Sequence, residues 1–376
     1  MSVRIAVLGV GGIGGTIAAN LLRDGYDVTM IDQWAAHVEA IRAQGLTLTD
    51  IDQEFTVRGT ALHLSDVSNI AAPFDYVFLS VKGYDTIWSA HLIAPHLKPN
   101  GCMLAAMNAL PDEAVASVVG FGRTVGCVAT ISAGMYRPGH VVRTDIKEHA
   151  FTVGELHGLV TPRARWAAEA LGAVGPSDTT TNIWGVRWAK MVWNCMGNAV
   201  AGSLGDAKLD PEQRQQRNRI EAALGVEAGR VALASGVALE PVLGIQPESF
   251  AAAETPAGFA QLCEAVDEIH SRRGLTPEQA ARLPEPGRPS LLQDVLKGRR
   301  TEVQQLNGHL VAEGRRLSVP VPVNEAMVTL MDDLAAGRAA TGVDNLKALA
   351  FTPVAETLRD TIAWFGDNGK IDSSTN

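Results

Sequence analysis

The sequence has little of what would assign it to several large classes of protein. Its 376 residues include four cysteines with no C-x-x-C pair, so neither a disulfide framework nor a cysteine-based metal site is expected. Acidic residues outnumber basic ones, 41 to 32, and the formal net charge of −9 argues against a nucleic-acid partner. Long apolar runs that would predict a membrane span are lacking, and the nine histidines form no HExxH-type ligand set.

The remaining composition is that of a globular protein, with 46% hydrophobic and 19% charged residues and enough length for two domains. The first apolar run starts at residue 3, which leaves no room for a signal peptide, and the cysteine pattern favours a reduced compartment. We therefore expect a cytoplasmic protein with neither a membrane nor a nucleic-acid partner and without a bound metal.

The clearest motif lies at the N-terminus, which reads VRIAVLGVGGIGGTIAANLLRDGYDVTMID. An apolar run ends in G-x-G-x-x-G, a helical pattern follows, and a second apolar run closes on Asp32. This order is typical of a strand, a tight turn and a helix whose N-terminus binds the pyrophosphate of a dinucleotide. The first glycine allows the turn, the second admits the pyrophosphate, and the third brings helix and strand together. The expected contacts are Gly9, Gly11, Gly12, Ile13 and Gly14.

Asp32 bears on which dinucleotide is bound. A carboxylate at the end of the second strand accepts the ribose hydroxyls of NAD and repels the 2′-phosphate of NADP. The next residues, 33–36, include no Arg or Lys to hold that phosphate. NAD is therefore favoured over NADP. The alternative is that a more distant base such as Arg42 binds the phosphate.

Apolar runs alternate with helical patterns in the first part of the chain, which predicts a doubly wound α/β sheet. From about residue 162, long amphipathic helices dominate. We predict a Rossmann domain at 1–176, an all-helical substrate and dimerisation domain at 177–365, and a disordered tail at 366–376. Strands are expected at 3–8, 27–31, 76–81, 102–107 and 125–131, with a hairpin inserted within 46–65 and antiparallel additions within 141–156; helices are expected at 162–174, 183–203, 211–235, 259–273, 290–296, 302–317 and 323–335.

Polar side chains follow two of the expected strands. Lys82 lies after the fourth strand and Asn108 after the fifth, where ligands bind in open α/β sheets. Lys82 offers a cation to the cofactor ribose or to an anionic substrate, and Asn108 offers an uncharged hydrogen-bonding group. The alternative for each is a strand-end residue that only meets water.

A second polar pattern lies within the helix expected at 183–203. Lys190, Asn194 and Asn198 are spaced i, i+4, i+8, so they share one stripe of an otherwise apolar helix. Desolvation lowers the pKa of a lysine toward neutrality, which suits it to general acid–base catalysis. The alternative is that Lys190 extends to solvent while the asparagines bind local backbone.

A third group lies in the segment 289–307. Ser290 and Gln293 form an S-x-x-Q pattern, which predicts Ser290 as a helix N-cap whose hydroxyl can meet a carboxylate. Glu302 is a candidate for binding a substrate hydroxyl or orienting a lysine. Its alternative is an exposed acid at the start of a helix, paired with Arg299.

Together these residues resemble the ketopantoate reductase (2-dehydropantoate 2-reductase) family over roughly residues 3–335. The resemblance rests on the GVGGIG loop, VKGY at Lys82, Asn108, the stretch KMVWNCMGN and the stretch SLLQDVLKGRRTEVQQLNG. It implies a Rossmann domain and a helical domain with the site between them, a small-molecule substrate and a homodimer. It also implies that Lys190 is the general acid, that Glu302 binds and orients the substrate, that Ser290 meets its carboxylate, and that Lys82, Asn108, Asn194 and Asn198 line the cleft.

Three departures point away from ketopantoate itself. The family's usual QNG after the fifth strand is MNA here, Gly287 replaces a substrate-binding Asn, and Asp32 contrasts with the usual use of NADPH. We therefore predict an NAD-dependent oxidoreductase that transfers a hydride between nicotinamide and a small 2-hydroxy acid or related secondary alcohol, with Lys190 as general acid/base. The alternatives are an NADPH-dependent 2-dehydropantoate 2-reductase of pantothenate biosynthesis and a non-catalytic NAD-sensing protein.

Overall fold

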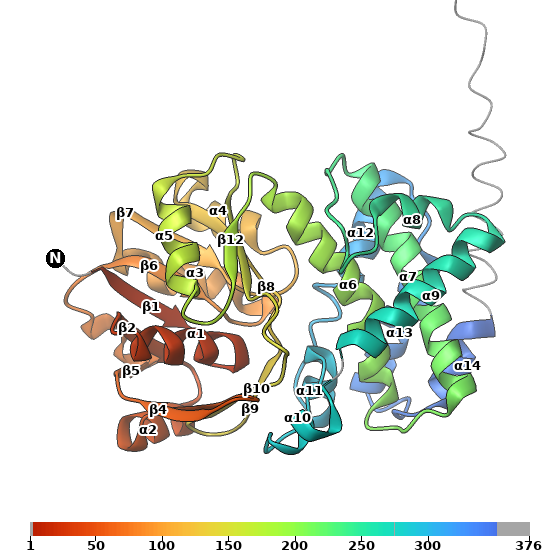
Figure 1. Ribbon diagram of the computed structural model, residues 1–376. Helices are drawn as coiled ribbons and strands as arrows, with labels where there is room; N and C mark the ends of the chain where they lie inside the picture. The colour runs from red at the N-terminus through yellow and green to blue at the C-terminus, as the bar shows by residue number, and fades with distance from the viewer. Residues whose placement is uncertain (1–2, 274, 352–376) are drawn as a thin grey trace, which may run out of the picture. The chain divides into compact units, whose positions relative to one another are not determined.

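The computed structural model describes residues 3–273 and 275–351, which group into two units (Figure 1). The first unit contains the residues up to Arg187 and the segment Arg273–Arg288, and the second contains Trp188–Arg272 and the residues from Pro289 onward. The domain limits expected at 1–176 and 177–365 stay predictions, and the tail expected at 366–376 lies outside the described residues. The N-terminal fold is an α/β sheet and the later part is helical, which confirms the predicted fold class.

The first unit is built on an eight-stranded sheet of order β12-β11-β8-β7-β6-β1-β2-β5. The six strands from β8 to β5 are parallel, and the order reverses direction between β1 and β6, at the point where doubly wound sheets bind ligands. The strands are β1 (Arg4–Leu8), β2 (Asp27–Asp32), β5 (Thr60–His63), β6 (Phe74–Leu79), β7 (Leu97–Ala105), β8 (Thr124–Ala129), β11 (Phe151–Glu155) and β12 (Ser177–Thr179).

Both faces of this sheet are buried near its centre, which explains the unbroken apolar run Ile5–Leu8 of β1. In β1, Ile5 and Val7 face one core while Ala6 and Leu8 face the other. The first core is shared with α1 (Gly12–Arg23), α2 (Ala35–Gln44) and α5 (Pro162–Leu171). The second core is covered by α3 (Thr86–Ile93) and α4 (Asp112–Val119).

A second, four-stranded sheet of order β4-β3-β10-β9 contains the predicted hairpin. The strands β3 (Leu46–Thr49) and β4 (Glu54–Val57) pair antiparallel, as expected, but outside the main sheet, and β9 (Ala133–Arg137) and β10 (His140–Arg143) complete their sheet. The expectation that both runs within 141–156 extend the main sheet is wrong for β10 and correct for β11, which pairs antiparallel with β8. The small sheet packs on α1, where a Cβ on Gly15 would lie 2.6 Å from Val141.

The segment Arg273–Arg288 belongs with the first unit although the helices on either side of it lie in the second. It contains α10 (Pro277–Ala281), whose capping box joins Thr276 and Gln279. Leu275 and Leu283 pack with Ile51 and Val142, so the segment adds to the core beside the small sheet.

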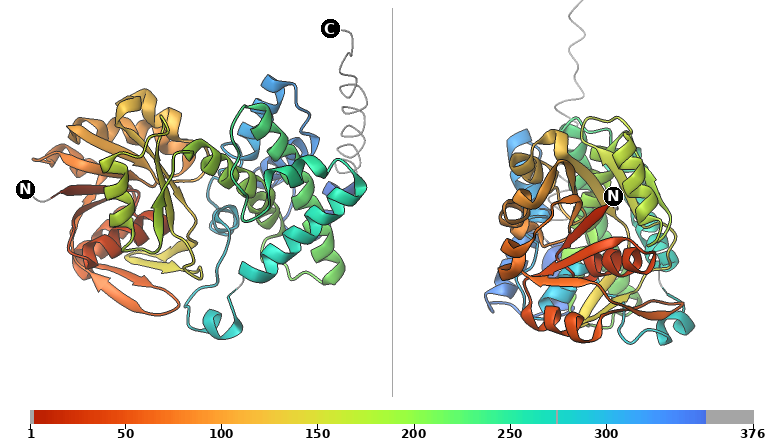
Figure 2. Two further views of the ribbon diagram at one scale, coloured as in Figure 1. Left: turned by 45° about the horizontal axis from the view of Figure 1, so that its top comes forward. Right: turned by 90° about the vertical axis from the view of Figure 1, so that its left-hand side faces the viewer.

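The second unit is made of helices, drawn in green to blue in Figures 1 and 2. Its central helix is α7, which is buried along most of its second half and begins with an Asp210–Gln213 capping box. Gly225 lets α7 approach α6, because a Cβ there would lie 2.8 Å from the Met196 sulfur. The helices are α6 (Ile183–Leu204, which begins in the first unit), α7 (Pro211–Ala234), α8 (Pro247–Ala252), α9 (Pro256–Arg273), α11 (Ser290–Leu296), α12 (Asn307–Leu317), α13 (Pro322–Ala335) and α14 (Asp344–Phe351).

The helix expected at 302–317 begins five residues later, at Asn307. Residues 302–306 form turns instead, in which the Gln305 and Leu306 N–H groups both donate to the Glu302 carbonyl at 3.0 Å. Leu306, at φ −104° and ψ −99°, lies outside the helical region and sets the start of α12. None of the helices in residues 3–273 and 275–351 is long and apolar enough to cross a membrane.

Candidate functional site

The glycine loop between β1 and α1 has the geometry that a bound phosphate requires. Gly9 has φ +91°, and a Cβ there would lie 2.6 Å from the Ser80 carbonyl oxygen. A Cβ on Gly14 would lie 1.9 Å from the Gly9 carbonyl oxygen, so this glycine permits the helix to approach the strand. At Gly11 a Cβ would meet no atom within 4 Å, and no side chain caps the start of α1. The loop therefore keeps open space beside an uncapped helix N-terminus, which fits a pyrophosphate.

Asp32 is tied to this loop by its side chain. The carboxylate accepts hydrogen bonds from the Val10 N–H at 2.7 Å and from the Trp34 N–H at 2.8 Å, and the residue is 8% exposed. Its negative charge therefore lies at the end of β2, where it would meet a ribose. Sequence alone showed the position of this acid but not its bond to the loop.

Arg42, the alternative holder of a 2′-phosphate, is already paired with carboxylates. Its guanidinium donates to Asp66 at 2.6 Å, to Glu39 at 2.7 Å and to the Ala61 carbonyl at 2.9 Å. The Arg42 guanidinium correspondingly lowers the pKa of Asp66. A phosphate at Arg42 would have to compete with these two carboxylates.

Lys82 and Asn108 follow adjacent parallel strands of the same sheet. Lys82 comes after β6 and precedes a short 3-10 turn (η2, Gly83–Asp85), and Asn108 comes after β7. Because β1, β6 and β7 are parallel neighbours, their carboxyl ends place both residues at the sheet edge that carries the glycine loop. Both side chains are partly buried rather than fully in water.

The loop that carries Asn108 is held by two residues that the sequence reading did not single out. Arg187, the fifth residue of α6, donates to the Ala105 and Met107 carbonyls at 2.9 Å each. It also pairs with Asp112, and both side chains are 1% exposed. Between these contacts, Ala109 adopts φ +67°, a left-handed conformation that disfavours a side chain. In the sequence, the only hint of this role was an arginine, Arg187, within an otherwise apolar helix.

In the second unit, α6 carries the predicted polar stripe. Asn194 is 3% exposed, and Lys190 and Asn198 are partly buried. Between them on the helix, Met191 and Cys195 are fully buried. The stripe is therefore embedded in the core-facing part of the helix.

Glu302 is 2% exposed, so its alternative as an exposed acid paired with Arg299 is wrong. The Ser290 hydroxyl donates to the Glu302 carboxylate at 3.4 Å. The prediction that Ser290 is an N-cap is also wrong, because Pro289 occupies the N-cap and Ser290 is the first residue of α11. The serine side chain thus reaches a buried acid rather than the helix backbone.

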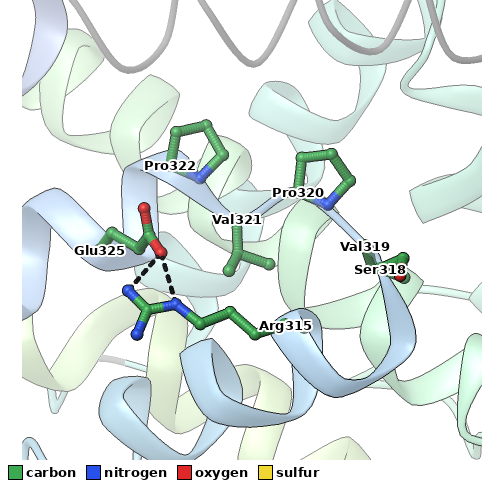
Figure 3. A pocket seen from close by; sticks show the side chains of 8 residues that line it. Arg315, Ser318, Val319, Pro320, Val321, Pro322 and Glu325 are labelled. Atoms are coloured by element: carbon green, nitrogen blue, oxygen red, sulfur yellow. Dashed lines mark hydrogen bonds and ion pairs between the residues drawn. The ribbon is translucent and has the colours of Figure 1, made fainter.

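Other features of the chain do not enter this site. Burial raises the pKa of the Cys102 and Cys127 thiols to about 12, so neither is a nucleophile at neutral pH. No group of His, Cys, Asp or Glu within the described ranges could hold a metal ion. A surface hollow of about 340 Å³ lies where α12 passes into α13, beside the 2.8 Å ion pair of Arg315 and Glu325 (Figure 3). None of the predicted site residues lines it.

Comparison with known proteins identifies the family of this chain. The family model described as ketopantoate reductase PanE/ApbA matches residues 5–158, and the model of its C-terminal part matches residues 182–335. The chain belongs to the ketopantoate reductase family. A 2-dehydropantoate 2-reductase of Archaeoglobus fulgidus is 24% identical over 338 residues, which cover 89% of this chain and 98% of that protein.

Solved structures share the fold. A 2-dehydropantoate 2-reductase from Geobacter metallireducens has a TM-score of 0.70 at 23% identity, covering 88% of this chain and 99% of its own. A D-mandelate dehydrogenase solved with NADH and anilino(oxo)acetate has a TM-score of 0.69 at 19% identity, covering 92% and 99%. The recognition made from the sequence motifs is thereby confirmed, and the chain is an oxidoreductase of this family.

Two departures from the family pattern have structural counterparts. Ala109 stands where the family's QNG has glycine, yet it keeps the positive φ of +67° that glycine would adopt without strain. At Gly287, where the resemblance implies an Asn, a Cβ would lie 3.1 Å from the Thr144 hydroxyl and 3.2 Å from its Cβ. A side chain at this position would require the Thr144 side chain to shift by a few tenths of an ångström.

Proposed function

We propose that the protein is an NAD-dependent oxidoreductase that transfers a hydride between nicotinamide and a small 2-hydroxy acid or related secondary alcohol. The observation that carries this proposal is the pair of Ser290 and Glu302, in which a hydroxyl meets a carboxylate that is 2% exposed. An acid buried in this way costs stability unless it has a partner or a task. It lies in the same unit as Lys190, the candidate proton donor.

In the proposed reaction the bound nicotinamide supplies or accepts the hydride at the carbon that bears the oxygen. Lys190 donates a proton to the carbonyl oxygen during reduction and accepts it from the hydroxyl during oxidation. The amine must be neutral to accept that proton, so alcohol oxidation should speed up as pH rises. Glu302 would bind and orient the substrate hydroxyl, and Ser290 would meet the substrate carboxylate.

The other predicted residues would bind rather than transfer protons. Asn194 and Asn198 offer amide groups on the stripe of Lys190, and Lys82 and Asn108 offer a cation and an amide at the sheet edge. All four are supported by their placement at strand ends or on one helix face.

NAD is proposed as the cofactor because Asp32 places a carboxylate at the end of β2 and Arg42 is held by Asp66 and Glu39. The fold neighbour solved with NADH is compatible with this choice. The loop residues Gly9 to Gly14 fit the pyrophosphate, since a Cβ at Gly11 would fill open space that the ligand needs. The cytoplasmic location and the homodimer stay predictions.

A second candidate is 2-dehydropantoate 2-reductase, because the curated relatives carry that name. Initial rates with ketopantoate and with a panel of 2-oxo acids and 2-hydroxy acids, each with NAD(H) and NADP(H), separate the two. A dominant rate with ketopantoate and NADPH would establish the second candidate. Binding of NADH without turnover of any member of the panel would instead support a non-catalytic NAD sensor.

The role of Lys190 is tested by Lys190→Ala. We expect turnover to fall by at least about 100-fold, the lower range for a general acid, with little change in the Kd for NADH. Lys208→Ala, at an exposed lysine soon after α6, is the matched control and should keep the wild-type rate. Near wild-type turnover by Lys190→Ala would refute the mechanism.

A further inference from the structure

The peptide groups of Val10 in the glycine loop are held from two sides. Its N–H donates to the Asp32 carboxylate at 2.7 Å, and its carbonyl oxygen lies 3.0 Å from Nε2 of His37. His37 belongs to α2, so a second element reaches the turn between β1 and α1. Val10 stands between Gly9 and Gly11, and a shift of its backbone would move the groups that face the pyrophosphate.

His37 is locked into one neutral tautomer by its surroundings. The Gly139 N–H, in the turn between β9 and β10, donates to Nδ1 at 2.8 Å. Nδ1 therefore carries no proton, and Nε2–H donates to the Val10 carbonyl. The ring is 0% exposed and stacks on Trp34 with 5.9 Å between ring centroids. No water reaches it to replace either bond.

Burial lowers the pKa of His37, and it outweighs the opposing effects of the Asp32 charge and of the Val10 hydrogen bond. Asp32 of β2 is the charged neighbour that acts on the ring among the described residues. In the turn that supplies Gly139, Arg137 donates to His140 at 2.7 Å. A proton added at Nδ1 would face the Gly139 N–H, so protonation would break this arrangement.

We propose that His37 is a positioning residue for the dinucleotide, which in its neutral form holds the Val10 carbonyl and thereby the glycine loop in the shape that receives the pyrophosphate. This inference rests on the proposed function, because it assumes that the loop binds NAD. It assigns a role to a residue outside the glycine motif and outside the substrate residues. It also links the small sheet, through Gly139, to cofactor affinity.

Two substitutions separate the two bonds of the ring. In His37→Gln the amide nitrogen can take the place of Nε2 and still donate to Val10, whereas in His37→Asn the amide oxygen can take the place of Nδ1 and still accept from Gly139. We measure the Kd for NADH and for NADPH by quenching of protein fluorescence, together with the melting temperature of each variant. His91→Asn, at an exposed histidine of α3, is the control.

We expect His37→Gln to bind NADH nearly as tightly as the wild type and His37→Asn to bind about fivefold more weakly, the factor for one ordinary hydrogen bond. The Kd of the wild type should stay constant from pH 8 to about 6.5 and rise only at lower pH, because burial holds the pKa of His37 below that of free imidazole. The Kd of His37→Gln should change less over the same range.

Lower melting temperatures with an unchanged Kd in both variants would show a structural role alone and overturn the proposal. Equal weakening in both variants would also overturn it, because the Val10 bond would then not be the decisive one. If the variants do not fold, the pH series on the wild type decides: a Kd that stays flat until the protein unfolds in acid refutes the inference. Failure of the wild type to bind either dinucleotide would instead refute the proposed function itself.

Discussion

Arg187 and Asp112 form an ion pair that excludes water, with Nε and Oδ2 2.7 Å apart and both side chains 1% exposed. The guanidinium also donates to the carbonyls of Ala105, the last residue of β7, and of Met107, which follows the strand. A pair buried this deeply contributes less net stability than its short distance suggests. Removal of one partner, however, leaves the other charge buried and unpaired, which is strongly destabilising. The pair thereby fixes the loop of Asn108 to the N-terminal part of α6.

Asp112→Ala should lower the free energy of unfolding by about 3 kcal/mol or more, because Arg187 would stay buried without its carboxylate. Urea denaturation followed by circular dichroism measures the loss. The double variant Asp112→Ala with Arg187→Leu should lose less than the two single losses added together. Strict additivity would contradict the coupling.

Ala109→Gly should raise the free energy of unfolding by about 0.5–1 kcal/mol. The substitution removes the strain of a side chain at φ +67°, and this gain exceeds the entropy that glycine adds to the unfolded chain. Ala116→Gly in α4 is the matched control and should lower stability by about 1 kcal/mol, since its backbone is helical. A loss at both positions would show that Ala109 is not strained.

Gly9→Ala and Gly11→Ala should separate folding from cofactor binding. At Gly9 the positive φ and the close Ser80 carbonyl make a Cβ destabilising, whereas at Gly11 the space is open. We expect Gly11→Ala to change stability by less than about 1 kcal/mol, within the range of an N-cap exchange, yet to weaken NADH binding. Thermal melts and NADH titrations give both quantities, and unchanged NADH affinity in Gly11→Ala would remove the loop from the binding site.

The free energy of unfolding should fall when the pH is lowered below the pKa that His37 has in the unfolded chain. The pKa of His37 is lowered in the folded state, so below about pH 6.5 the unfolded chain takes up a proton that the folded chain does not. The contribution of His37 to the free energy of unfolding is therefore complete above about pH 6.5. It is lost as pH falls, by at most about 1.4 kcal/mol per pH unit. The difference in unfolding free energy between the wild type and His37→Gln, measured from pH 7.5 to 5, should shrink in this direction. A constant difference would contradict the linkage.

Much of this fold could be predicted from local patterns in the sequence. The strand–turn–helix at the N-terminus and the helix of Lys190 were predictable because hydrophobic period and glycine spacing are local properties of the chain. The sheet that contains β3 and β10 was not, since its pairing joins residues about ninety apart, as in the register of Thr47 with His140. Its close packing on Gly15 could not be read from either strand alone.

In the candidate site, too, some features could be predicted from the sequence and others depend on the fold. Glu302 was singled out from the sequence as an acid of interest, but its burial and its serine partner depend on turns that replace an expected helix. Arg187 and His37 escaped notice because their partners are mostly backbone groups, which leave no trace in residue type. Side-chain motifs can be read from the sequence, whereas bonds to the main chain require the fold.

The chain passes from one unit to the other after Arg187, after Arg272 and again after Arg288. No single cut can therefore release either unit with all its parts. A fragment that ended at residue 187 would leave Ile51 and Val142 without the leucines that pack on them. A chimera made by exchanging halves of this chain at one junction would lose that packing, so it would need to carry the segment Arg273–Arg288 together with the first unit.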